Sequence, residues 1–181
     1  MKKQVVVLVL AAVLVFGCAL GGTLAWLKDN TQTVVNTFTA GDVDIELEET
    51  TGDRYKMVPG KILDKDPTVT VTDDSEHAWV FVKIVNVNDA ENFLSYEIAT
   101  GWAVLPGHDN VWYREYAGTE DGATYQVLKD NQVTVDTDVT KAQLDGIVEG
   151  SEPKLEITAY AVQYDATSIA DAEAAWDVID G

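Results

Sequence analysis

The residues best suited to catalysis are sparse in this sequence. It contains two histidines, His77 and His108, and one cysteine, Cys18. His77 follows Glu76, but no second histidine lies four residues away, so the HExxH pattern of zinc peptidases is missing. His108 lies in a Pro-Gly-His-Asp stretch that is typical of a loop. No nucleophile elbow, phosphate-binding glycine loop or EF-hand pattern occurs, so we predict that the chain is not an enzyme and assign no catalytic, cofactor-binding or metal-binding residue.

Carboxylates are the chemically active groups that the chain has in excess. Its 31 Asp and Glu residues outnumber 12 Lys and Arg residues, which gives a formal net charge of −19. Closely spaced carboxylates offer oxygen ligands to Ca²⁺, or serve only as solvated turns, at Asp64-x-Asp66, Asp73-Asp74 and Asp136-x-Asp138. We therefore expect no cofactor beyond weak Ca²⁺ binding. Such an acidic surface repels phosphate, so neither nucleic acid nor an anionic membrane surface is an expected partner.

The first 25 residues have the pattern of a secretory leader. Two lysines precede an unbroken apolar run of twelve residues, Val5 to Phe16, which is shorter than the roughly 20 residues that span a membrane. Thr23-x-Ala25 satisfies the small-x-small rule of signal peptidase. We predict cleavage between Ala25 and Trp26, a leader at 1–25, and contact with the membrane only before this cleavage.

Two alternatives to this processing stay open. If the apolar run continues through Leu20, the segment becomes an uncleaved membrane anchor. Val15-Phe16-Gly17-Cys18 also loosely resembles a lipobox, in which the cysteine is lipidated and becomes the new N-terminus. Cleavage after Ala25 would instead remove the only cysteine, so the mature chain would have neither a disulfide nor a thiolate nucleophile.

The mature chain, residues 26–181, has the length of a single domain. A chain of this size buries roughly 68–70% of its unfolded surface, so it can fold without disulfides. Without Lys2 and Lys3 it has 10 basic and 31 acidic side chains, a formal charge of −21. We expect this acidity to keep the secreted protein soluble, and divalent cations to screen it.

Alternation of apolar and polar residues predicts many short strands. In 42–47, every second residue is apolar and the others are acidic, which indicates a strand with one solvated face. Ala40-Gly41-Asp42-Val43 predicts a type II′ hairpin turn back to a partner strand at 33–39. Ala78–Val87 is apolar on both faces and is therefore expected at the centre of a sheet. Further strands are expected at 68–72, 93–98, 102–105, 111–116, 125–128, 132–135 and 154–164, with a hairpin turn at Lys129-Asp130-Asn131.

Two short helices complete the predicted pattern. One is expected at 140–148, ended by Gly150. The other is expected at 168–179, capped by Ser168, with an apolar stripe formed by Ala172, Ala175, Trp176 and Ile179. About eight short strands and two minor helices indicate an all-β fold, a jelly-roll-like antiparallel β-sandwich with one or two peripheral helices.

Three stretches together resemble the TasA/camelysin family of secreted Gram-positive proteins, which are exported with a SipW-type signal peptidase. They are Gly21-Gly22-Thr23-Leu24-Ala25-Trp26 followed by Asp29, Asn36 to Ile45, and Val58 to Pro67. The resemblance implies a jelly-roll-like sandwich and protein fibres of the biofilm matrix. Some members carry a metallo-endopeptidase label, but this chain lacks the zinc signature that would support it, and no catalytic residue is carried over.

These observations predict a secreted structural subunit of extracellular biofilm-matrix or cell-surface fibres. Its expected partners are other copies of itself, in a homopolymer, and further matrix proteins. We expect assembly by strand addition, in which the N-terminal segment of one subunit completes the sheet of the next. The anchoring side chains would be Trp26, Leu27, Val34, Val35 and Phe38.

Three alternatives to this function stay open. The N-terminal segment could pair within its own subunit. The chain could be a camelysin-like surface metallo-endopeptidase, or a monomeric surface lipoprotein or adhesin anchored at Cys18.

Overall fold

The computed structural model describes residues 43–51, 55–119, 121–165 and 167–180. The chain divides into two units, Met1–Thr39 and Ala40–Gly181, and every described residue lies in the second unit. The partner strand expected at 33–39 therefore lies outside the described residues, and so does the turn expected at 40–43, except for Val43.

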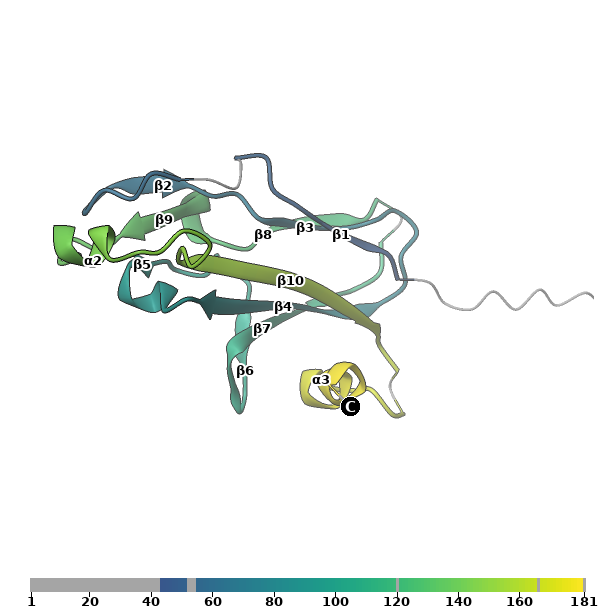
Figure 1. Ribbon diagram of the computed structural model, residues 1–181. Helices are drawn as coiled ribbons and strands as arrows, with labels where there is room; N and C mark the ends of the chain where they lie inside the picture. The colour runs from purple at the N-terminus through teal and green to yellow at the C-terminus, as the bar shows by residue number, and fades with distance from the viewer. Residues whose placement is uncertain (1–42, 52–54, 120, 166, 181) are drawn as a thin grey trace, which may run out of the picture. The chain divides into compact units, whose positions relative to one another are not determined.

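The described residues form three antiparallel sheets (Figure 1). The first has the strand order β1-β3-β8, at Ile45–Glu48, Thr68–Val71 and Ala123–Gln126. The second has the order β10-β4-β7-β6, at Lys154–Gln163, Ala78–Val87, His108–Tyr116 and Ala103–Leu105. The third has the order β2-β9-β5, at Ile62–Asp64, Gln132–Val135 and Leu94–Ser95.

The first and third sheets form one interrupted layer. Strand β2 continues into β3, and β8 continues into β9, so that β3 pairs with β8 and β2 pairs with β9. Two backbone bonds carry the pairing across the interruption, from Val127 N–H to Pro67 oxygen at 3.0 Å and from Lys65 N–H to Asn131 oxygen at 2.8 Å.

The hairpin expected at Lys129–Asn131 is wrong. This segment forms a 3₁₀ turn, η2, in which Asp130 and Asn131 adopt positive φ of 55° and 54°. Strands β8 and β9 do not pair with each other, because the turn bends one strand path instead of reversing it. Asp and Asn are favoured in hairpin turns and in such kinks for the same reason, their tolerance of the left-handed conformation.

The main hydrophobic core lies between this layer and the second sheet. Val69 and Val71 from β3 pack with Val80, Val82 and Ile84 from β4. The opposite face of β4 is covered as well, because Phe81 is fully buried in a second apolar cluster. The expectation that Ala78–Val87 forms a central strand is confirmed.

Helix α3, Ala172–Asp180, forms a third layer against the outer face of β4, β7 and β10 (Figure 1). Trp176 is 2% exposed, and its ring lies 5.3 Å from that of Phe81 and 5.6 Å from that of Tyr160. The expected cap at Ser168 is wrong. Asp171 caps the helix instead, accepting the Ala174 N–H at 2.8 Å.

Helix α2, Lys141–Asp145, is shorter than expected. Thr140 and Gln143 form a reciprocal capping box at its start, and the helix ends at Gly146 rather than near Gly150. The described residues form the antiparallel β-sandwich with two short helices that the sequence predicts.

Candidate functional site

The two histidines lie at opposite ends of β7. His77 directly precedes β4, where Ala78 pairs with Tyr116 at the end of β7, whereas His108 begins β7. At about 3.4 Å per residue, the length of this strand separates the two imidazoles by more than about 20 Å. One metal ion cannot bind both.

Each histidine has its own local contacts. His77 Nε2 lies 2.7 Å from Glu115 Oε1, and its ring stacks on that of Tyr164 with centroids 4.1 Å apart. The ring of His108 meets Trp176 edge-on at 5.9 Å. Within the part of the chain that the structure describes, no group of three or more His, Cys, Asp or Glu residues is placed to hold a metal ion.

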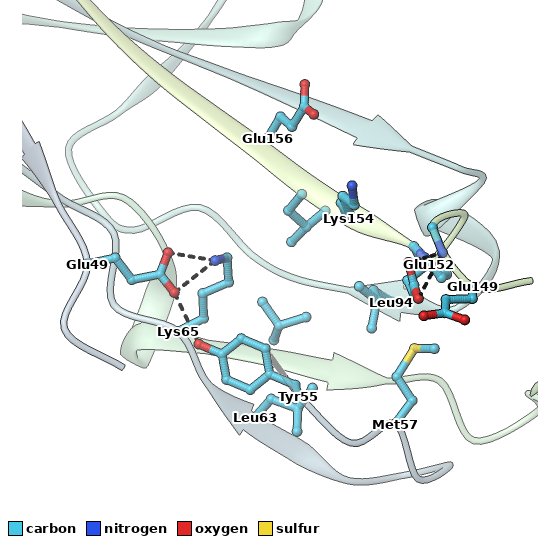
Figure 2. Close-up of a pocket in the computed structure, with 14 residues that line it drawn as sticks. Glu49, Tyr55, Met57, Leu63, Lys65, Leu94, Glu149, Glu152, Lys154 and Glu156 are labelled. Atoms are coloured by element: carbon cyan, nitrogen blue, oxygen red, sulfur yellow. Dashed lines mark hydrogen bonds and ion pairs between the residues drawn. The ribbon is translucent and has the colours of Figure 1, made fainter. Parts of the chain in front are cut away.

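A groove with a volume of about 920 Å³ lies between β2 and β10 (Figure 2). It has an apolar floor and a charged rim. The floor includes Met57, Leu63, Leu94, Val133, Pro153 and Leu155, and the rim includes Glu49, Lys65, Glu149, Glu152, Lys154 and Glu156.

A second hollow of about 290 Å³ extends this groove along β10. The two share Glu49, Lys65 and Leu155, and the second adds Leu47 of β1 and Ile157 of β10. We refer to this continuous depression, between β1 and β2 in one layer and β10 in the other, as the open seam.

Hydrogen bonds fix one wall of the open seam. Lys65 Nζ lies 2.7 Å from Glu49 Oε2, and the Tyr55 hydroxyl donates to Glu49 Oε1 at 3.1 Å (Figure 2). Asp66 accepts from the backbone N–H groups of Thr50 and Thr51 at 2.9 and 3.0 Å, and from both hydroxyls. These bonds, led by that of the Thr50 hydroxyl, hold the pKa of Asp66 far below its usual value.

The open seam exposes side chains that the alternating pattern predicts to be buried. On β10, Leu155 and Ile157 point toward the main core but remain half-buried. Opposite them, Leu47 of β1 is 37% exposed. Across the described ranges, β10 pairs with β4 along one edge and with no strand along the other. A ten-residue strand therefore presents unpaired backbone groups beside an apolar groove.

The opposite side of the sandwich, between β8 and the edge formed by β6 and β7, is built differently. The guanidinium carbon of Arg114 lies 3.5 Å from the ring centre of Tyr125 and 5.3 Å from that of Trp102. The indole N–H of Trp102 donates to the carbonyl oxygen of Gln126, at the end of β8, at 2.8 Å. We refer to this side as the closed seam, because aromatic and cationic side chains cover it.

None of the residues predicted to direct processing or assembly falls within the described ranges. Ala25, Trp26, Leu27, Val34, Val35 and Phe38 all precede residue 43, where description begins. The groove along β10 was not predicted from the sequence. Alternation in 154–164 indicated a strand with apolar residues on each face, but it carried no information on which face would lack a covering layer.

The sequence comparisons assign a family. A family model described as camelysin metallo-endopeptidase matches residues 1–92, half of the chain, so the chain belongs to the TasA/camelysin family, whose members are extracellular or surface-associated. Comparisons with curated proteins and with solved structures give no match. Among the described residues, no helix has the length and apolar character needed to cross a membrane.

The metal that the family name implies does not fit the described residues. The matched segment contains one histidine, His77, and its imidazole is engaged with Glu115 and Tyr164. His108 lies at the far end of β7, as described above. The carboxylate of Asp66, which belongs to one of the spaced acidic pairs, is occupied by Thr50 and Thr51.

Proposed function

We propose that this protein is a secreted structural subunit of extracellular biofilm-matrix or cell-surface fibres, which assembles by N-terminal strand addition. The observation that carries the proposal is the edge of β10 that no described strand pairs, beside the apolar floor of the open seam. A sheet edge of this kind offers N–H and C=O groups that an extended segment can pair, while adjacent pockets receive its alternate side chains.

The N-terminal segment, residues 26–38, has the properties required of the added strand. It is rich in Val and Thr and has apolar anchors at both ends. The anchors are Trp26, Leu27, Val34, Val35 and Phe38. Fully extended, the segment reaches roughly 40 Å, which exceeds the roughly 33 Å length of β10.

The geometry of the proposed contact supports a polymer. If the segment of one copy enters the open seam of the next, each copy offers two different surfaces, and the head-to-tail contact does not close on itself. Pairing of the segment with β10 of its own subunit would satisfy the same groups and leave a monomer. We propose that the N-terminal segment pairs with β10 of another copy.

Deletion of residues 26–35 tests this choice. We expect the truncated protein to fold and remain monomeric, while the full mature protein forms fibres visible by electron microscopy. Because the mature chain has a charge of −21, its fibres should form more readily with added salt or Ca²⁺, or at pH 4–5, near the sequence pI of about 4.1. Equal fibre formation by both proteins would exclude strand addition, and loss of folding on truncation would indicate pairing within the subunit.

Processing provides a second test. We propose that the leader is removed between Ala25 and Trp26, which frees the N-terminal segment. Intact-mass measurement of the secreted protein should give a chain that begins at Trp26. A lipidated chain that begins at Cys18 would instead support a surface lipoprotein.

The family description favours one other function, that of a surface metallo-endopeptidase. We propose that the protein acts without catalysis, because its two histidines are far apart. Highly purified protein should show no chelator-sensitive proteolysis. Proteolysis that is lost both on chelation and in a His77→Ala variant would overturn this proposal.

A further inference from the structure

Arg114 is a cation without an acidic partner among the residues that the structure describes, in a strongly acidic protein. Lys65, Lys129 and Lys141 each pair with a nearby carboxylate. Arg114 forms no ion pair with any described residue, and its Nε is buried without a hydrogen-bond partner. Burial lowers the pKa of this guanidinium, as expected of a charge that has lost water without gaining a counter-charge.

The surroundings hold this guanidinium in place. The Tyr125 ring lies against it, and the hydrogen bond of Trp102 to the end of β8 fixes the second ring. Gly101 has a φ of +96°, and a side chain there would begin 3.2 Å from an Arg114 terminal nitrogen. The positive φ favours glycine here, and the missing Cβ also avoids a close contact with the fork with which arginine binds carboxylates.

The composition of this cluster is typical of a protein interface. Tryptophan, tyrosine and arginine are the residues most enriched among those that dominate binding energy, particularly where they are rigid and partly shielded from water. The cluster is half-buried rather than enclosed. On the neighbouring edge strand β6, Val104 is 54% exposed.

We propose that Arg114, held by Trp102 and Tyr125, is a docking site for a carboxylate of a second copy of this chain, supplied by the acidic face of β1. This contact is separate from the open seam and does not require the N-terminal segment.

Strand β1 is the source of carboxylate that the structure favours. Asp44 directly precedes it, and Glu46 and Glu48 lie within it. All three are exposed, and none forms an ion pair within the described ranges. Strands β1 and β8 are opposite edges of the same sheet. A contact from β1 of one copy to the cluster beside β8 of the next joins two different surfaces, so it propagates rather than closes.

Substitution of Arg114 is the first test. Self-association of the mature protein is measured by analytical ultracentrifugation over a range of concentrations. Arg114→Gln should raise the concentration needed for half-maximal association by about tenfold or more, because it removes a charged partner from a partly buried pair. Arg114→Lys should recover only part of this loss, because lysine lacks the planar fork. Lys129→Gln, which removes the same charge at an exposed position, should change it by less than about twofold.

Substitution of the β1 carboxylates gives the second test. The decisive observation is whether self-association becomes weaker or tighter. The triple variant Asp44→Asn, Glu46→Gln and Glu48→Gln removes three negative charges, so general repulsion alone predicts tighter association. The proposal predicts weaker association. A matched control on α3, Glu173→Gln with Asp177→Asn and Asp180→Asn, removes the same charge and should leave association unchanged or tighter.

Three outcomes would overturn the proposal. In the first, Arg114→Gln associates as strongly as the wild type. In the second, the β1 triple variant associates at least as strongly as the wild type. In the third, the wild-type protein does not self-associate at all. Thermal unfolding of each variant establishes that it is folded, and the β1 variant decides the matter if Arg114→Gln does not fold. If Arg114→Gln loses binding to polygalacturonate but keeps self-association, the ligand is an acidic polysaccharide and the proposed partner is wrong.

Discussion

The two sides of this sandwich differ in how their edge strands are covered by side chains. On each side, an edge strand of one sheet faces an edge of the other sheet across the core. At the closed seam, Trp102, Arg114 and Tyr125 fill the space beside β8, and an indole N–H occupies its last carbonyl. At the open seam, no described side chain does the same for β10, and Leu155 and Ile157 remain half-buried.

The two seams therefore differ in how far the edge of a strand is accessible to another chain. An unpaired edge invites association with another chain, and proteins normally block it. Here one seam is blocked by bulky side chains and the other is left as an apolar groove along a strand of ten residues. Under the proposed function, the open seam receives the N-terminal strand of another copy, whereas the closed seam receives side chains.

The largest expected effect comes from a charge in the groove. Ile157→Asp should abolish fibre formation, because a carboxylate would have to be buried against the added strand. Thr158→Asp is the matched control, since it adds the same charge on the opposite, exposed face of β10. Electron microscopy and light scattering should show fibres for the control only. Loss of fibres in both variants would mean that net charge, and not the groove, governs assembly.

The next effect concerns the closed seam. Trp102→Ala should lower the free energy of unfolding by about 2–4 kcal/mol, because it removes a half-buried indole and its hydrogen bond. It should also expose the edge of β8 to unspecific association. Chemical denaturation measures the first effect and turbidity at neutral pH the second. Trp102→Phe should restore most of the stability, and an unchanged turbidity in Trp102→Ala would show that the indole does not protect this edge.

A smaller, pH-dependent effect is expected at the wall of the open seam. The folded-state pKa of Asp66 lies below the ordinary value of 3.8, so the ionised carboxylate stabilises the fold above about pH 4 and loses this effect as the pH falls. Asp165 behaves in the same way, with a pKa lowered to about 2, first by the Thr167 hydroxyl. Asp66→Asn should therefore lower the urea midpoint at pH 7, and the difference from wild type should shrink between pH 4 and pH 2.

Asp64→Asn is the control for this measurement. It removes a neighbouring exposed carboxylate that accepts no hydrogen bond from the described side chains. Its urea midpoint should follow that of the wild type throughout the pH range. A constant difference between Asp66→Asn and the wild type from pH 7 to pH 2 would contradict the role assigned to Asp66.

Much of the fold could be predicted from the sequence because its strands alternate cleanly. Ala78–Val87 is apolar on both faces, and the structure covers both. The Ala172, Ala175 and Trp176 stripe likewise packs on a sheet. The errors arose where one local signal fits two geometries. Asp130 and Asn131 suit a hairpin and a kink equally, and Ser168 and Asp171 are both good helix caps.

The sites were harder to predict because they depend on contacts between distant segments. Arg114 and Tyr125 are separated by a turn and belong to strands in different layers. Leu155 and Ile157 look like ordinary core residues in the sequence, and only the arrangement of the described strands reveals that they line a hollow and stay half-buried. Periodicity reports which residues share a face, but not what lies across from it.

Site-specific disulfide formation can show whether the N-terminal segment of one copy enters the open seam of another. The chain without residues 1–25 contains no cysteine, so single cysteines can be introduced cleanly. A donor carrying Val34→Cys or Val35→Cys is mixed under oxidising conditions with an acceptor carrying Ile157→Cys in the open seam or Thr124→Cys beside the closed seam. We expect intermolecular cross-links to Ile157→Cys from one of the two donors, since adjacent residues of a strand face opposite sides, and none to Thr124→Cys. Cross-links to Thr124→Cys alone, or a disulfide that forms only within a single chain carrying both Val35→Cys and Ile157→Cys, would contradict this expectation.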